Sequence, residues 1–376
     1  MHDDVFACRW CGSTACTTVL DLGAQPPSDV FPRAGAGEPV ASYPLSMVVC
    51  GRCGLAQLAH DPTEADEPRG LEPRALVEQA HAAVDAVARA GLLAAAPRVA
   101  EYDSPHGGSW RSLLVGRGCV DVTGQAGYAD VVVDVFGLMH EADQRAAVRA
   151  RTERLAPGGV LLVQYHPLTT IVEQGQWNAL RHGHMAYYST RALTGMLAGH
   201  GLVAESAWTF PLYGGTVLLA ARRGGTAGPS VRELLAADDA RGVLGPELAA
   251  GLQGIASAAA ARLRGWLCDQ RRGGRRVLGY GAASRAVPLL VAAGIMPDLL
   301  RAVADGSAAK WGRLIPGVDI PIISPAELCA ARPDAVLLFV PDLLDEVRRA
   351  LPEVEAGGGR WVLAEAEPRP VPPQAH

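Results

Sequence analysis

The chain has almost no lysine, no long apolar run and no excess of positive charge. Lys310 is the only lysine among 34 basic residues, so a lysine Schiff base has a single candidate position. No apolar run approaches the length of a membrane span and the first residues do not form a signal peptide, so neither membrane insertion nor export is expected. The net charge of −5 comes from interspersed acids and bases, which offer no basic face for nucleic acid.

Four cysteines form two tight pairs near the start, Cys8 with Cys11 and Cys50 with Cys53. A pair separated by two residues can place both thiolates on one metal ion, and two pairs complete the tetrahedral shell of a structural zinc ion. In a chain without an export signal, such cysteines are expected to be metal ligands in a cytoplasmic protein rather than disulfides. The loop between the pairs is longer than in common zinc ribbons, so four thiols without a metal remain the alternative.

The chain is long enough for two or three cores, since 49% of its 376 residues are hydrophobic and only 19% are charged. Strand and helix patterns alternate in two separate stretches, which predicts two open parallel sheets with sites at the carboxyl ends of their strands. The predicted strands include Arg98–Tyr102 and Asp130–Val135, and helices are expected over 69–91, 144–155 and 190–200. The expected domains are a zinc-binding domain (1–62), an α/β core (63–225), a helical linker (226–275) and a second α/β domain (276–376).

A turn and a histidine in the first α/β stretch point to a substrate site. Pro157-Gly158-Gly159 leads into the apolar run 160–164, a turn into a strand that is common in class I methyltransferase folds. His140 follows the strand 130–135 and is therefore expected at the carboxyl edge of the sheet, where substrates lie. The alternative is that His140 caps the helix that follows.

The segment 176–189 concentrates polar and aromatic side chains around one glycine. It contains Arg181, His182, His184 and Tyr187, and Ser189 is placed to cap the next helix. A loop with this content can hold a polar ligand and move a proton. The alternatives are a solvated loop with incidental histidines, or a metal site formed by two histidines for which no third ligand is obvious.

In order and in motifs, the chain resembles the sugar C-methyltransferases, which make branched deoxysugars for antibiotics. The likeness covers nearly the whole chain. It rests on the cysteine pairs, Leu20–Pro26, His140, the loop ending in His184, Tyr213-Gly214-Gly215, Gly279–Ala282, and Asp305 to Gly317 with Lys310 and Arg313. The resemblance implies an N-terminal zinc-binding module, a class I methyltransferase-like Rossmann core and a second, C-terminal Rossmann-like α/β domain.

The resemblance also implies a reaction and its residues. A nucleotide-linked 4-keto sugar would lose a proton next to its carbonyl, and the enolate would attack the methyl group of S-adenosylmethionine. His184 falls at the position of the base, since a neutral imidazole suits proton transfer near neutral pH. The expected catalytic residues are His184, His140, His182 and Arg181; the expected cofactor-binding residues are Glu101, Asp103, Gly107, Gly108 and Asp121; the expected substrate-binding residues are Tyr187, Tyr213, Tyr280, Ser284, Lys310 and Arg313.

The chain departs from the family pattern mainly where the methyl donor should bind. Pro105 and His106 intrude into the turn after the first core strand. A second strand is expected at 118–122, and the strand and helix that should follow it are missing before Asp130. Arg181 replaces a tyrosine of the family, and Gly183 replaces a glutamate. Two alternatives to a methyltransferase therefore stay open. One is a donor-independent epimerase or isomerase that uses the same enolate, and the other is a non-catalytic binding protein stabilised by zinc.

Overall fold

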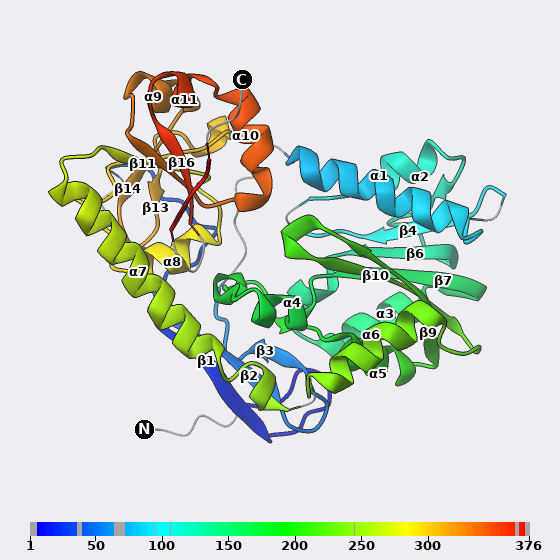
Figure 1. The fold of residues 1–376 in the computed structure, drawn as a ribbon. Coiled ribbons are helices and arrows are strands. Elements are labelled where there is room, and N and C mark those ends of the chain that lie inside the picture. Colours follow the sequence, from blue (N-terminus) through cyan, green and yellow to red (C-terminus); the bar gives the residue numbers. More distant parts are fainter. Residues whose placement is uncertain are drawn as a thin grey trace.

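The computed structural model describes residues 6–35, 40–63, 72–93, 95–105, 107–243, 245–364 and 368–372. These residues form three sheets in three parts of the molecule, and the long helix α7 (Leu252–Arg272) runs along one side between the first part and the last (Figure 1). Some predicted features lie outside the described residues: the start of the helix at 69–71, His106, and Glu367 and 373–376 of the Pro-rich end.

The N-terminal sheet lies beside the cysteine pairs and includes one strand, β8, from the core segment of the chain. Its order is β1-β2-β3-β8, all antiparallel. The strands are β1 (Cys16–Gln25), β2 (Tyr43–Cys50), β3 (Ala56–Leu58) and β8 (Ala186–Tyr187). Because β8 belongs to the predicted polar loop at 176–189, this pairing fixes that loop against the cysteine-bearing module.

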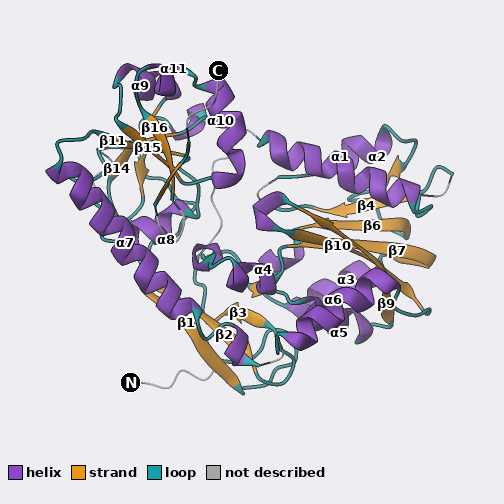
Figure 2. Cartoon of the chain, in the orientation of Figure 1, coloured by secondary structure: helices purple, strands orange, loops and turns teal. Residues whose placement is uncertain are grey.

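The core sheet has the order β5-β4-β6-β7-β10-β9, with helices on both of its faces (Figure 2). Its strands are β4 (Arg98–Tyr102), β5 (Val120–Asp121), β6 (Ala129–Val135), β7 (Leu155–Tyr165), β9 (Leu202–Phe210) and β10 (Thr216–Arg223). Helices α1 (Arg74–Arg89) and α2 (Arg111–Val115) cover one face, and α3 (Gln144–Glu153) and α5 (Thr190–Ala198) cover the other. Valines 131–133 and 135 of β6 are buried, which is the pattern expected for a strand covered on both sides.

The expectation of a wholly parallel core sheet is wrong for β10. Strand β10 is antiparallel to both β7 and β9, whereas β5, β4, β6 and β7 are parallel. Only five residues, Pro211–Gly215, connect β9 to β10, and so short a link can join only antiparallel neighbours. The predicted loss of a strand and helix after β5 is confirmed within the described residues, since the chain passes from β5 directly to β6.

The C-terminal sheet has the order β13-β14-β12-β11-β15-β16-β17, parallel in its centre and antiparallel at both edges. Its strands are β11 (Val277–Tyr280), β12 (Val303–Ala304), β13 (Leu314–Ile315), β14 (Ile320–Ile323), β15 (Ala335–Leu338), β16 (Arg360–Leu363) and β17 (Arg369–Pro370). Its helices are α8 (Ala286–Ala292), α9 (Pro325–Ala330), α10 (Leu344–Ala350) and α11 (Glu353–Ala356). Ser324 and Glu327 form a capping box that fixes the start of α9.

The two helices of the predicted linker pack differently. Helix α6 (Pro229–Ala240) lies on β9 and α5 of the core, whereas α7 contacts β1, α8 and β11. One hydrophobic cluster therefore runs from the N-terminal sheet through α7 into the C-terminal sheet, with Leu45, Leu263 and Val303 among its members. This shared core holds the first and last domains together and leaves the polar loop between them. Among the described residues, no helix is both long and apolar enough to cross a membrane.

Candidate active site

The four predicted zinc ligands meet in one cluster. The Sγ atoms of Cys8, Cys11, Cys50 and Cys53 all lie within 4.8 Å of one another. Four sulfur atoms this close together can bind one metal ion. Each pair sits on a turn closed by the following glycine, where Gly12 and Gly54 adopt positive φ and donate to the carbonyls of Cys8 and Cys50.

The distances between the thiols fit a tetrahedral zinc ion. The Sγ atoms of Cys8 and Cys53 are 3.5 Å apart and those of Cys11 and Cys50 are 3.6 Å apart. Zinc–sulfur bonds of about 2.3 Å place tetrahedral sulfurs about 3.8 Å apart. A hydrogen bond from Cys53 lowers the pKa of the Cys8 thiol to about 5, so one thiolate forms readily. With four protein ligands, such an ion would be structural.

The polar loop brings His184 and His140 together at the carboxyl end of β6. Their ring centroids are 4.8 Å apart and nearly perpendicular. His140 Nδ1 lies 2.8 Å from the carbonyl oxygen of Gly183, and Gly183 N–H donates to Asp61 of the N-terminal module. The alternative of His140 as a helix cap is wrong, because the carboxylate of Asp143 caps α3 by accepting from Ala146 N–H at 2.9 Å.

Arg181 joins His184 to the C-terminal domain. Its Nε donates to His184 Nε2 at 2.8 Å, and its Nη1 donates to the hydroxyl of Ser284. A guanidinium can only donate, so Nε2 of His184 is the acceptor and the neutral ring carries its proton on Nδ1. The basic lone pair of His184 is therefore the one that faces Arg181.

The other two predicted residues of this loop face different surroundings. His182 is buried against the N-terminal module, with Nε2 3.3 Å from the carbonyl of Pro44, and burial lowers its pKa. Tyr187 is also buried; its hydroxyl donates to Ala179 O at 3.2 Å, and its ring centroid lies 6.2 Å from that of His184. The structure thus places Tyr187 beside the His140–His184 pair and turns His182 away from it.

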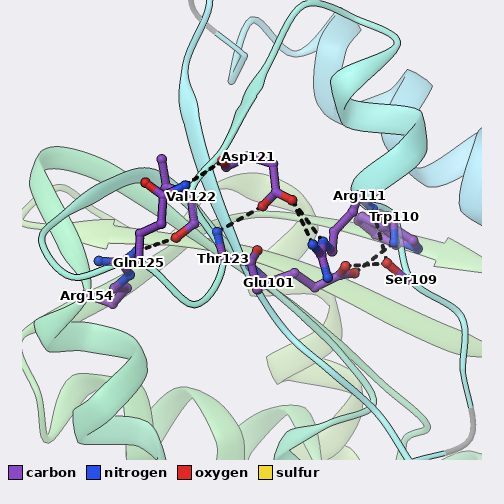
Figure 3. A network of polar contacts seen from close by, with 9 residues as sticks. All are labelled: Glu101, Ser109, Trp110, Arg111, Asp121, Val122, Thr123, Gln125 and Arg154. Carbon is purple, nitrogen blue, oxygen red and sulfur yellow. Dashed lines mark hydrogen bonds and ion pairs between the residues drawn. The ribbon is translucent and has the colours of Figure 1, made fainter.

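The predicted donor-binding carboxylates Glu101 and Asp121 lie in β4 and β5 and accept hydrogen bonds from residues close to them in the chain (Figure 3). Glu101 accepts from Ser109 Oγ at 2.5 Å and from Trp110 N–H at 2.8 Å, and burial raises its pKa. Asp121 accepts from Arg111 Nε at 3.0 Å and from Thr123 N–H at 2.9 Å. Hydrogen bonds from Thr123 and the Arg111 guanidinium lower the pKa of Asp121.

The paired glycines lie between β4 and α2; residues 103–105 and 107–110, with Glu101 and Asp121, are called the donor turn. The glycines face the segment before α1. Gly107 and Gly108 both have positive φ, and Gly108 N–H donates to the carboxylate of Glu72. Asp103 is exposed beside them. The chemical groups of these residues suit S-adenosylmethionine. The carboxylates can accept hydrogen bonds from ribose hydroxyls, and the glycine N–H groups can donate to the carboxylate of the donor. In this conformation, Glu72 and Arg111 already occupy two of those groups.

The predicted substrate residues of the C-terminal domain lie in three different surroundings. Ser284 reaches the site through Arg181. Lys310 and Arg313 instead hold the N-terminal module: Lys310 Nζ lies 4.6 Å from the Phe31 ring centroid and donates to Ala282 O at 3.0 Å, and Arg313 Nη1 donates to Phe31 O at 2.8 Å. Tyr280 packs edge-on against Trp361 in the domain core, and burial raises its pKa to about 12.

Two residues that the sequence analysis did not single out lie beside the site. His166 directly follows β7, and its ring lies 6.2 Å from that of Tyr213. Burial lowers the pKa of His166 to about 3, so the ring is neutral. Arg285 lies over the Tyr213 ring at 5.4 Å. The rule that placed His140 at a strand end also selects His166, whereas nothing in the sequence singles out Arg285.

Tyr213 has a strained backbone. It adopts a φ of 57°, and Phe136, whose ring packs edge-on against it, adopts a φ of 58°. Left-handed conformations are costly for aromatic residues and are often found at functional sites. The predicted substrate residue Tyr213 thus stands between His166 of the core and Arg285 of the C-terminal domain.

Comparison with known proteins shows three family profiles along the chain. Residues 8–66 match a profile described as "Putative zinc binding domain", residues 50–207 match "Methyltransferase domain", and residues 211–364 match "C-methyltransferase C-terminal domain". The curated protein C-methyltransferase NovU of Streptomyces niveus is 25% identical over an alignment of 418 positions, which covers 96% of each chain.

Two solved structures similar to this chain cover 41% and 39% of it. The N-methyltransferase NodS from Bradyrhizobium japonicum, in complex with S-adenosyl-l-homocysteine, is 15% identical with a TM-score of 0.31 over 41% of this chain and 90% of that chain. The magnesium protoporphyrin IX methyltransferase ChlM from Synechocystis is 11% identical with a TM-score of 0.30 over 39% and 83%. Scores this low support no inference about this chain.

The order of the three matched domains agrees with the three parts of the fold and with the clustered cysteines at its start. The predicted family and fold class are confirmed. Along its length the chain carries a zinc-binding domain, a methyltransferase domain and a C-methyltransferase C-terminal domain, and it is a transferase related to C-methyltransferase NovU.

Proposed function

We propose that the chain is an S-adenosylmethionine-dependent C-methyltransferase for a nucleotide-linked keto-deoxysugar, in the biosynthesis of a secondary metabolite such as an antibiotic. The observation that supports this most directly is the meeting of His184 and His140 at the carboxyl end of β6. The three matched domains and the likeness to C-methyltransferase NovU also favour it.

In this proposal, His184 Nε2 takes a proton from the carbon next to the substrate carbonyl. The neutral ring, with its proton on Nδ1, has its basic lone pair on Nε2, where Arg181 now donates. His140 lies against the His184 ring and is fixed by the Gly183 carbonyl, so it can orient or polarise the keto group. The electron pair of the broken C–H bond stays on the substrate as an enolate.

The residues that would hold the donor are Glu101, Gly107, Gly108 and Asp121. S-adenosylmethionine, when bound, supplies an electrophilic methyl group. Binding requires Glu72 to leave Gly108 N–H and Arg111 to release Asp121, because both contacts occupy the groups that would face the donor. The buried Trp110 beneath this turn anchors it to the core, so only side chains need to move.

Incubation of candidate 4-keto sugar nucleotides with the zinc-loaded protein in D₂O tests the proposal. Mass spectrometry should find one deuterium next to the carbonyl without donor, and a methylated product when S-adenosylmethionine is added. If no candidate exchanges and none is methylated, the proposal fails.

A second candidate function is a donor-independent epimerase or isomerase that uses the same enolate. It is favoured by the contacts of the donor turn, where Glu72, Arg111, Ser109 and Trp110 satisfy the groups that would otherwise bind a donor. Deuterium exchange without methyl transfer, together with no binding of S-adenosylhomocysteine by calorimetry, would select this function over the first.

A further inference from the structure

The turn that carries His140 is held by hydrogen bonds on both sides of that histidine. A short 3₁₀ turn at 138–140 precedes α3, whose first residue is Gln144. Gln144 Nε2 donates to the carbonyl oxygen of Leu138 at 2.9 Å and to that of Glu141 at 2.7 Å. An amide nitrogen carries two protons, so it can serve both carbonyls at once. One side chain therefore holds the backbone before and after His140.

The other end of the same amide reaches the polar loop. Gln144 Oε1 accepts from the Tyr188 hydroxyl at 2.5 Å, and both side chains are buried. The Tyr188 ring is itself fixed, because it packs edge-on against the Tyr165 ring with 6.3 Å between their centroids. Gln144 thus connects the turn that carries His140 with the loop that carries His184.

A buried ion pair holds the same turn from the side of β6. Asp134 Oδ1 accepts from Leu138 N–H at 2.9 Å, and its Oδ2 accepts from Arg151 Nε at 2.5 Å. Arg151 Nη2 also donates to the Glu141 carboxylate at 3.2 Å. The two charged side chains of the pair are 0% and 2% exposed. A satisfied buried network of this kind makes the local structure rigid, so the turn has little freedom to shift.

We propose that Gln144 is a positioning residue that sets the distance and angle between His140 and His184, and that it acts through the Tyr188 hydroxyl. The inference deepens the proposed function and rests on it, because the two histidines would act on neighbouring atoms of one substrate, the carbonyl oxygen and the C–H carbon. The contact of His140 Nδ1 with Gly183 O at 2.8 Å already joins the two segments. One contact alone allows rotation about itself, and the bond from Tyr188 to Gln144 fixes the angle.

The chemistry of the side chain explains why a glutamine suits this position. An amide of this length accepts from Tyr188 and donates to two carbonyls at the same time, whereas glutamate lacks the donors and methionine lacks both functions. A displacement of about 1 Å between reacting groups can cost about a hundredfold in rate. A positioning role therefore predicts a fall in kcat with little change in KM.

Tyr188→Phe tests the proposal, and Tyr165→Phe is its matched control. The two rings pack against each other and both hydroxyls are buried, but the Tyr165 hydroxyl donates to Thr190 Oγ1 at 2.8 Å. Each variant keeps its ring and loses one buried hydrogen bond, so a purely structural effect would be similar in both. For deuterium exchange into a keto sugar by the full-length, zinc-loaded protein, we expect Tyr188→Phe to lower kcat about tenfold with KM within about threefold of the wild type. Tyr165→Phe should change kcat less than about twofold.

A double variant tests the route through Gln144. Gln144→Met should lower kcat about a hundredfold, and adding Tyr188→Phe to it should lower kcat no further, because the hydroxyl then has no amide through which to act. The inference is overturned if Tyr188→Phe exchanges as fast as the wild type, or if Tyr165→Phe loses as much as Tyr188→Phe. Effects that multiply in the double variant would overturn the route through Gln144.

Proton NMR of the imidazole rings separates this inference from the proposed function, because it needs no substrate. Variants His140→Gln and His184→Gln assign the two signals. Tyr188→Phe should shift both signals and Tyr165→Phe neither, since only the first breaks the bond to Gln144. These shifts in a protein that exchanges no keto sugar overturn the proposed function alone. Unshifted signals in Tyr188→Phe overturn the inference, whatever the protein does with a keto sugar.

Discussion

The region around His184 and the donor turn lie at the same edge of the core sheet, but their polar side chains find partners at very different distances along the chain. His140 contacts Gly183, Gly183 contacts Asp61, and Arg181 contacts Ser284, so the His184 region is built by all three domains. In the donor turn, Glu101 contacts Ser109 and Asp121 contacts Arg111. The difference teaches that the first region depends on domain assembly, whereas the second is closed within the core domain, where Glu72 also bonds to Gly108.

Loss of the metal should therefore disturb the His184 region and spare the donor turn. We expect Cys50→Ser to lose zinc and unfold the N-terminal sheet, because binding of structural zinc contributes about 10 kcal/mol or more to folding. Strand β3 pairs with β8, so amides of 182–187 should exchange faster, and deuterium exchange into substrate should fall at least a thousandfold. Hydrogen exchange with mass spectrometry measures both regions.

The control for this experiment is Cys329→Ser on α9, outside the cysteine cluster. It should keep the zinc and the protection of both regions. If Cys50→Ser leaves the polar loop as protected as in the wild type, the N-terminal module does not support that loop.

Removal of the base should have the next largest effect, and only on proton transfer. We expect His184→Gln to reduce deuterium exchange into the keto sugar by about a thousandfold, within the range of general base catalysis. His182→Gln, on the same loop but bonded to Pro44, should lose less than tenfold. Exchange rates measured by mass spectrometry decide between the two histidines, and equal losses would mean that the loop acts only as a unit.

The sequence predicted best what depends on local spacing. Each cysteine pair is two residues apart on one turn, so the metal cluster was readable, and β4 begins and ends at the predicted residues. The rule that sites lie at the carboxyl ends of parallel strands put His140 at the end of β6, and the structure brings the His184 ring to within 4.8 Å of it. The assignment of His184 as the base came from the family resemblance and stays a prediction. His166 follows β7 in the same way and could have been found by that rule.

The sequence could not predict contacts that depend on how domains and loops pack. Whether His182 or His184 faces the site is set by the pairing of β8 with β3, and no periodic pattern reports that pairing. Lys310 lies against Phe31, a residue 279 positions earlier, because the first and last domains share a core. The contact of Glu72 with Gly108 likewise has no signal in spacing or composition.

The donor turn should open when its carboxylate partner is removed. Glu72→Ala frees Gly108 N–H and removes a negative charge that repels the donor carboxylate, so S-adenosylhomocysteine should bind about tenfold more tightly. Glu78→Ala is the matched control, since Glu78 pairs with Arg74 on the exposed side of α1. Calorimetry measures both affinities. Unchanged binding in Glu72→Ala would show that Glu72 does not compete with the donor.

The smallest effect is on the pH dependence of the free energy of unfolding, which should differ in sign between His166 and Glu101 of the donor turn. Burial lowers the pKa of His166 to about 3, whereas an unfolded histidine titrates near 6.5. The unfolded chain therefore binds a proton that the folded chain does not. The stability from His166 is complete above about pH 6.5 and is lost as pH falls toward 3, by at most about 1.4 kcal/mol per pH unit.

Glu101 of the donor turn has the opposite sign. Burial raises its pKa, so its contribution is present at low pH and declines as pH rises through the folded value. We expect urea unfolding between pH 5 and 6.5 to show a shallower pH dependence in His166→Asn than in the wild type, by at most one proton. His81→Asn, on the exposed face of α1, controls for the loss of an imidazole. If the slope of the unfolding free energy against pH is the same in His166→Asn as in the wild type, His166 takes up its proton in the folded protein as readily as in the unfolded chain. The His166 ring beside Tyr213 would then be charged at low pH.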